Sequence, residues 1–332
     1  MPVEAGGARE PGVVILYLFY PTGPHYRKER PIRELRRIAC RLPGRKTILY
    51  IDNSQTSRIA PRQSGENEYV IGGDNSGMEF SGWQAGVEFL HNRGLPGDVC
   101  LFANDTFLAR SRFHRGLLNR GAVECAARYS AMVGKRMVLD AEGRILGNPL
   151  IPYIRTHLFL LPRDVVDELG TVVSLDRRST DRLLLPGFEP SVHLFQPDAP
   201  ISRPIQDYLR FHLHSVWYRR RPYNAENFER LRGKAASILN ALLLSIRVYD
   251  LGYPLVSLAN VPRFLRMNPP VGRLRSEWTD RHGRPRPGNG SPPNPFWGPG
   301  SVAYRRVPAS MRPFSLENVL DLLERSSHPD HL

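Results

Sequence analysis

Three hydrophobic runs in the first third of the chain, each of strand length, end in clusters of small polar residues. The runs at 47–51, 69–72 and 98–103 lead into a polar set that includes Asp52, Asn53, Asn75, Asn104 and Asp105. Helical patterns separate the runs, and such alternation of strands and helices favours a mostly parallel sheet. Ligands of open α/β sheets bind just beyond the carboxyl ends of the strands. The sequence therefore predicts an α/β domain with a polar ligand site at one edge of its sheet.

The spacing of apolar residues predicts the elements around this site. A further strand is expected at 13–20, and a helix begins near Pro31, a residue that suits the first helical turn. Ser76 and Glu79 have the spacing of a capping box, in which the glutamate bonds back to the start of its helix. Helical spacing then continues through Phe80, Trp83, Val87 and Leu90. This spacing indicates that Trp83 belongs to the core rather than to an acceptor platform.

The rest of the chain is less regular. A strand is expected at 153–161, and a short helix follows Pro162 and ends at Gly170. Residues 177–200 are expected to be loop, and a long helix is expected at 234–251. Its inward residues would be Ile238, Leu239, Leu242, Ile246 and Tyr249.

Four segments follow from these patterns. The α/β domain would span 11–200, and a helical extension on the acceptor side would span 201–267. Residues 268–308 are rich in Pro, Gly and Arg and predict an irregular segment. An amphipathic helix and a tail would occupy 309–332.

The chain is strongly basic, with a formal net charge of +14 and an isoelectric point near 10.1. Such a balance favours anionic partners: nucleotide diphosphates, acidic lipid headgroups or nucleic acid. The sequence has no apolar run of about 18 residues and no signal-peptide pattern at its start, so we expect a cytoplasmic protein without a spanning helix. Cys40, Cys100 and Cys125 are odd in number and lack C-x-x-C spacing, which predicts free thiols that behave as small hydrophobes.

Several segments resemble glycosyltransferases of the GT-A type. Residues 48–57 resemble their first nucleotide-contacting strand, residues 72–90 their N-x-G element and its helix, and residues 98–108 their strand that ends in a D-x-D-like motif. In the order and residue pattern of these segments, the chain is most similar to the rhamnan-synthesis family of bacterial polysaccharide biosynthesis. Residues 151–169 and 243–258 resemble later elements of that family.

The resemblance, which spans roughly residues 11–260, implies a GT-A-like fold and a nucleotide-sugar donor. The residues that it places at the donor are Asp52 and Asn53 near the base and ribose, Asn75 and Gly77 in the pocket wall, and Asn104 beside Asp105. Gly77 would let the backbone approach the nucleotide closely.

Asp105 would hold a divalent cation, Mg²⁺ or Mn²⁺, on the donor diphosphate, since hard cations prefer oxygen ligands. The D-x-D-like motif has one acid where two are usual. The alternative is therefore a metal-independent enzyme in which a basic residue, Arg155, neutralises the leaving group.

Three residues are candidates for the catalytic role: Asp105, Glu79 and His157. Each has a structural alternative. Asp105 has the composition of a helix cap, Glu79 fits the capping box, and a single strand histidine is often structural. Asp52 and Asn75 likewise fit ordinary turns. Family members often carry an acid shortly before a Leu-Ser pair, where this chain has Ala241.

The predicted function is sugar transfer from a nucleotide donor to a polysaccharide or lipid-linked glycan acceptor. The alternative is a non-catalytic carbohydrate-binding or assembly protein with the same fold. Residues 210–223 interleave aromatic and basic side chains. This stretch is a solvated basic face, a contact with anionic membrane lipids at which the protein would bind peripherally, or, as the least favoured reading, an RNA-binding segment.

Overall fold

A computed structural model describes most of the chain up to residue 268. The described residues are 10–20, 29–54, 60–110, 114–139, 141–190, 194–211, 213 and 223–268. The irregular segment and the terminal helix expected after residue 268, and most of the basic stretch at 210–223, lie outside the described residues.

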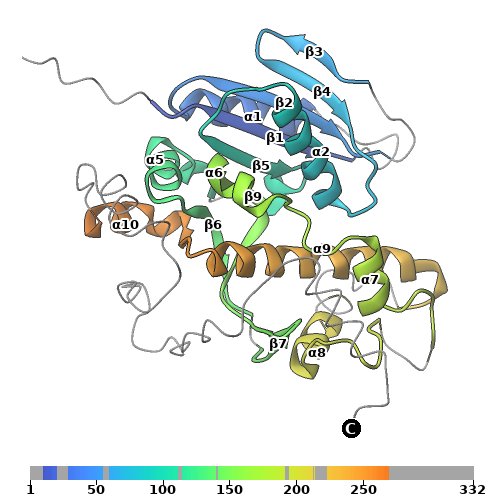
Figure 1. The fold of residues 1–332 in the computed structure, drawn as a ribbon. Helices are drawn as coiled ribbons and strands as arrows, with labels where there is room; N and C mark the ends of the chain where they lie inside the picture. The colour runs from blue at the N-terminus through green and yellow to red at the C-terminus, as the bar shows by residue number, and fades with distance from the viewer. Residues whose placement is uncertain are drawn as a thin grey trace, which may run out of the picture.

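The described residues form an eight-stranded sheet with the order β10-β6-β9-β5-β1-β2-β4-β3 (Figure 1). Strands β1, β2, β4 and β5 are parallel to one another, while β9 runs antiparallel to β5 and β6. The expected mostly parallel α/β sheet is confirmed. The strands are β1 (Val13–Phe19), β2 (Lys46–Asp52), β3 (Arg62–Gly65), β4 (Glu68–Gly72), β5 (Val99–Asn104), β6 (Met132–Met137), β9 (Tyr153–Pro162) and β10 (Leu255–Ser257), with β7 (Arg144–Ile145) and β8 (Asn148–Pro149) in a separate hairpin.

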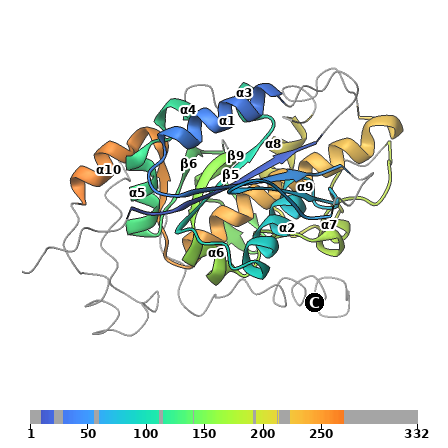
Figure 2. The same cartoon turned by 90° about the horizontal axis from the view of Figure 1, so that it is seen from above.

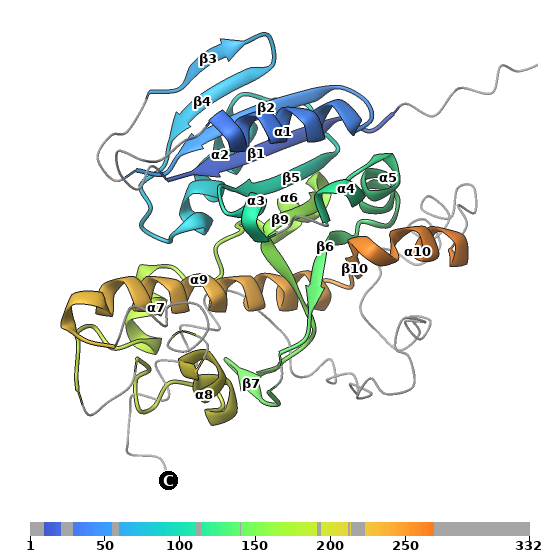
Figure 3. The same ribbon diagram turned by 180° about the vertical axis from the view of Figure 1, so that it is seen from behind.

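Helices cover both faces of the sheet. The helices are α1 (Glu29–Arg41), α2 (Glu79–Asn92), α3 (Phe107–Arg110), α4 (His114–Leu117), α5 (Arg120–Tyr129), α6 (Arg163–Leu169), α7 (Arg177–Leu183), α8 (Arg203–Phe211), α9 (Ala225–Asp250), the 3-10 helix η2 (Leu258–Asn260) and α10 (Val261–Met267). Figure 2 shows α1, α4, α5 and α10 on one side of the sheet and α2, α6 and α7 on the other. Figure 3 shows the long α9 running past the sheet, with β7 and α8 on its far side.

The core around the parallel strands has two layers, because successive side chains of a strand point to opposite faces, and a third cluster lies between α7, α8 and α9. Ile15 of β1 packs with Leu35 of α1 in one layer, and its neighbour Leu16 packs with Trp83 of α2 in the other. Trp83 is fully buried, so its predicted core position is confirmed. Its ring stands edge-on at 5.5–5.7 Å to three aromatic rings, those of Phe80, Phe102 and Phe159.

The structure corrects three expectations about local structure. Residues 177–200 are not all loop, because Asp176 accepts a hydrogen bond from the amide of Ser179 and so caps α7. Helix α9 was expected to begin near 234 but begins at Ala225, because the side chain of Asn224 caps it there. Tyr249, expected to face inward, is exposed at the end of α9.

The three cysteines are free, as expected. Cys100 and Cys125 are buried, but Cys40 lies on the exposed side of α1 and not in the core. Burial raises the pKa of both the Cys100 and the Cys125 thiol to about 12. None of the described helices has the length and apolar character that a membrane span requires.

Candidate functional site

Asp52 and Asp105 lie on either side of the carboxyl end of β1. Asp52 pairs with Phe19, the last residue of β1, and Asn104 pairs with Leu18 on the other side. The carboxylate of Asp105 then accepts a hydrogen bond of 3.2 Å from the amide of Tyr20. Two strand spacings separate the backbones, about 10 Å. The predicted meeting of these polar strand ends at one edge is thus present in the structure.

A buried asparagine organises the same edge. The side-chain amide of Asn53 donates to the side-chain oxygen of Asn75 and to the carbonyl of Met78, both at 2.8 Å. The amide of Asn75 donates back to the side-chain oxygen of Asn53 at 3.1 Å. Asn53 is only 1% exposed, whereas Asn75 and Met78 are half-buried, so the network reaches from the interior to the surface. Both asparagine side chains therefore fix the turn after β4 next to β2.

This network depends on two glycines that the sequence did not single out. A Cβ atom on Gly73 would lie 2.4 Å from the side-chain oxygen of Asn53, and one on Gly82 would lie 2.8 Å from it. The turn between them also carries positive φ angles at Asn75 (54°) and Met78 (56°), which few side chains adopt. Gly77, the predicted pocket glycine, has a more ordinary conformation, and its amide donates to the hydroxyl of Ser81.

Glu79 does not form the predicted capping box. It is the first residue of α2, whose N-cap is Met78, and no side chain caps this helix. The hydroxyl of Ser76 instead donates to Asp74. The carboxylate of Glu79 accepts a hydrogen bond of 2.7 Å from the hydroxyl of Ser237 on α9. The tertiary contact with α9 replaces the local cap and anchors the start of α2 to that helix.

Asn104 supports the residue that follows it. Its side-chain oxygen accepts from the amide of Thr106 at 3.2 Å and from the hydroxyl of Thr106 at 2.6 Å. This closed turn directs the chain so that the Asp105 carboxylate reaches the end of β1. The side chain of Asn104 is buried, so it supports the turn at Asp105 from the protein interior.

Strand β9 extends the sheet past the end of β5. Leu158 pairs with Ala103, so His157 follows at the position beside the end of β5. Arg155 lies further out and pairs with Lys135 of β6. Burial, and then the positive charge of Arg155, lower the pKa of Lys135. Two cationic residues therefore lie just beyond the same edge as Asp105.

The described residues contain no preformed site for the predicted metal ion. Among the residues that the structure describes, no three His, Cys, Asp or Glu side chains come together as a metal site. Asp105 is a single carboxylate. Mg²⁺ is often held by one or two carboxylates together with substrate phosphates, so this residue fits a cation only when the diphosphate supplies further ligands.

A cavity of about 730 Å³ lies on the other side of the turn after β4. It is walled by β4, α2 and the segment at 173–177, and it reaches Gly77 but neither Asp52 nor Asp105. Partial burial alone would raise the pKa of Asp74 in its wall, but hydrogen bonds from Ser76 outweigh it and lower that pKa. Asp176, another wall residue, caps α7. These two carboxylates are thus engaged in local hydrogen bonds that hold the fold.

Three side chains hold the segment at 169–175, part of which walls this cavity, and none of them was singled out from the sequence. The oxygen of Gln84 accepts from Thr171 and Val172, each at 3.0 Å. The oxygen of buried Asn240 accepts from the amides of Ser174 and Leu175, each at 2.8 Å.

Arg247, two helical turns after Asn240, donates to the carbonyls of Leu169 and Val173. Burial lowers the pKa of this arginine to about 10. The spacing of Asn240 and Arg247 on a long apolar helix is the signal that identifies them, because polar groups on a buried face need partners.

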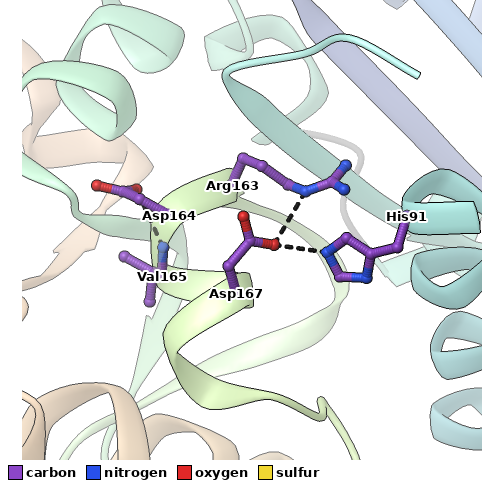
Figure 4. Close-up of polar contacts among 5 residues, drawn as sticks. All are labelled: His91, Arg163, Asp164, Val165 and Asp167. Carbon is purple, nitrogen blue, oxygen red and sulfur yellow. Dashed lines mark hydrogen bonds and ion pairs between the residues drawn. The ribbon is translucent and has the colours of Figure 1, made fainter. Parts of the chain in front are cut away.

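A polar cluster at the opposite edge of the sheet is separate from this site. Figure 4 shows Asp167 of α6 accepting from Arg163 and contacting His91 at the end of α2, at 3.1 and 2.7 Å. Pro162, which precedes this helix, pairs with Val99 at the start of β5. The cluster therefore joins α2 to α6 at the amino ends of the parallel strands.

No protein-family model and no curated protein matches the sequence. Among solved structures, the chain is similar to a mannosyltransferase, PcManGT from Pyrobaculum calidifontis, in complex with GDP-Man and Mn²⁺. The identity is 12%, the match covers 82% of this chain and 84% of that chain, and the TM-score is 0.30. A TM-score this low assigns neither fold nor function. The geometry itself defines the class: an open α/β protein with a polar site at the carboxyl edge of its parallel strands.

Proposed function

We propose that this chain is a nucleotide-sugar-dependent glycosyltransferase with a GT-A-like fold. The observation that carries the proposal is the position of Asp52 and Asp105 on either side of the carboxyl end of β1. A nucleotide diphosphate linked to a sugar presents ribose hydroxyls and phosphates within one extended molecule. Two acidic residues on strands whose backbones lie about 10 Å apart are suited to contact its two ends.

In this proposal Asp52 accepts hydrogen bonds from the base or ribose. Asn53 and Asn75 would hold the wall of the donor site through the hydrogen bonds between them. A cation that arrives with the diphosphate would be held by Asp105 and would offset the charge on the leaving group. Arg155 lies at the same edge and supplies positive charge if the enzyme works without metal.

The reaction breaks the bond between the anomeric carbon and the phosphate oxygen and forms a bond to an acceptor hydroxyl oxygen. The hydroxyl proton passes to a basic group. His157 and Glu79 are the candidates near the edge besides Asp105, although Glu79 is already bonded to Ser237. Ala241, at the position where resembling enzymes often carry an acid, is buried and apolar.

The proposed acceptor is a polysaccharide or a lipid-linked glycan, by resemblance to the rhamnan-synthesis family. A second candidate is a non-catalytic carbohydrate-binding protein. The single carboxylate at the D-x-D-like position favours this candidate.

A thermal-shift screen of the full chain against UDP-, GDP-, dTDP- and CMP-sugars, with and without Mn²⁺, tests the proposal. A donor at a hundred times its dissociation constant should stabilise the protein by about 2.7 kcal/mol. Stabilisation by one donor class followed by its hydrolysis or transfer supports the enzyme. Binding without any turnover supports the carbohydrate-binding alternative, and no shift with any donor contradicts both the donor site and the enzyme.

A further inference from the structure

The two helical layers of the protein differ in charge. The layer made of α1, α4, α5 and α10 contains ten arginines and three glutamates. The layer made of α2, α6 and α7 contains four arginines and six acidic residues. These layers lie on opposite sides of the sheet (Figure 2). The positive charge of the described helices is therefore concentrated on one face, called here the arginine face.

Helix α1 contributes a stripe of arginines along this face. Arg30, Arg33, Arg37 and Arg41 recur at spacings of three or four residues, so they share one side of the helix, and all four are exposed. The opposite side of α1 carries Leu35 and Ile38, which are buried against the sheet. The packing of α1 thus fixes the direction in which its arginines point.

Four of the ten arginines in these helices form ion pairs: Arg36 with Glu68, Arg37 and Arg115 with Glu34, and Arg120 with Glu10 and Glu124. Arg30 and Arg33 form no ion pair with any other described residue, and the same holds for the arginines of α10. A surface that keeps so many unpaired guanidinium groups together repels itself, because like charges at this spacing are unfavourable. An anionic partner would relieve that repulsion.

The chemistry of the face distinguishes between two anionic partners. Single-stranded nucleic acid is usually held by exposed aromatic rings on which bases stack. In these four helices the aromatic rings, those of Tyr129 and Phe264, pack edge-to-face on each other at 5.0 Å. Tyr129 also donates its hydroxyl to the carbonyl of Asn268. No described aromatic ring of the arginine face is therefore presented for stacking.

Binding to a lipid surface does not require exposed aromatic rings. Anionic headgroups require only basic side chains spread over a wide area, and arginine binds phosphate in a bidentate manner. The arginine face extends over several helices, and Met267 at the end of α10 is 45% exposed, which offers an apolar side chain beside Arg263 and Arg266. We propose that the arginine face docks the protein on anionic phospholipid membranes. This docking does not depend on the proposed sugar transfer.

Vesicle co-sedimentation of the full chain tests the proposal. We expect binding to vesicles in which a third of the phosphatidylcholine is replaced by phosphatidylglycerol, and weak binding to phosphatidylcholine alone. Each basic side chain near an anionic surface contributes about a factor of five in affinity. The variant R30Q/R33Q/R37Q should therefore bind the anionic vesicles about a hundredfold more weakly, with an unchanged circular dichroism spectrum.

A matched variant controls for net charge. R177Q/R178Q/R230Q removes three exposed arginines from α7 and α9, outside the arginine face. It should lose less than threefold in affinity. Equal losses in the two variants, or equal binding to neutral and anionic vesicles, would overturn the proposal. The proposal would also be overturned if the full chain did not bind vesicles but bound a short single-stranded RNA, and R30Q/R33Q/R37Q abolished that binding.

Discussion

The amide of Tyr20 donates a hydrogen bond to the carboxylate of Asp105, joining two strand ends that lie 85 positions apart in the sequence. The bond forms because β1 and β5 are parallel neighbours whose carboxyl ends meet at one edge. It holds the single acid of the D-x-D-like segment beside β1, with Asp52 on the other flank. The proposed donor site rests on this relationship.

The substitution D105N isolates the charge of this residue, because its amide oxygen can still accept the hydrogen bond from Tyr20. We expect the thermal midpoint of the free protein to stay close to that of the wild type. The affinity for the donor found by screening should fall at least tenfold when measured by calorimetric titration, since a charge-assisted contact is lost.

The control for this variant is D74N, because Asp74 lies in the turn after β4 and lines the cavity of about 730 Å³. It should bind the donor as the wild type does. Loss of donor binding in D74N but not in D105N would assign the donor to the cavity.

The substitution G82A tests the packing that supports the edge. A Cβ atom there would lie 2.3 Å from a methyl group of Leu18 and 2.8 Å from the oxygen of Asn53. Overpacking of this kind costs about 1–3 kcal/mol. Urea unfolding should show that loss in G82A. G116A, where an added Cβ meets nothing within 4 Å, should stay within about 0.5 kcal/mol of the wild type. Equal stability of the two variants would contradict the described packing.

The substitution N240A tests the segment behind the cavity. The asparagine oxygen accepts from the amides of Ser174 and Leu175, and its removal leaves two buried donors without that acceptor. Each such group costs about 1–3 kcal/mol, so the free energy of unfolding should fall by about 2–6 kcal/mol.

N92A makes the same change at an exposed wall residue of the cavity and should have little effect on urea unfolding. Faster hydrogen exchange at 171–176 in N240A alone would locate the effect. A wild-type exchange rate there would show that Asn240 does not hold the segment.

The cysteines provide a pH-dependent prediction. The pKa of Cys100 and Cys125 is raised from 9.0 to about 12 by burial. Above pH 9 the unfolded chain loses these protons while the folded protein keeps them, so their contribution lowers stability as pH rises from 9 to 12. The slope is about 1.4 kcal/mol per pH unit for each thiol. C100A/C125A should therefore lose less stability than the wild type between pH 9 and 10.5. Identical slopes would show that neither thiol is buried.

A thiol reagent gives a second measurement on the same residues. At neutral pH one thiol, that of Cys40, should react in the folded protein, and all three should react in denaturant. Protection of Cys40 would contradict the exposed side of α1.

The sequence predicted the sheet better than the details of the site. Buried runs such as 13–19 have no polar positions, and this pattern identifies central parallel strands without knowledge of their neighbours. The capping box at Glu79 was predicted wrongly because it is a local signal, whereas the observed partner of Glu79, Ser237, lies 158 positions away. The close packing of Gly82 against the side chain of Asn53 could not be predicted either, since it depends on how closely α2 approaches β2. Helix α7 was missed because Asp176 and Ser179 also suit a loop.

The most direct test is a co-crystal structure of the full chain with the nucleotide sugar that stabilises it most. We expect the ligand to lie over the end of β1, with the nucleoside contacting Asp52 and the diphosphate next to Asp105. A ligand seated in the cavity between α2 and the segment at 173–177, away from both carboxylates, would contradict this expectation.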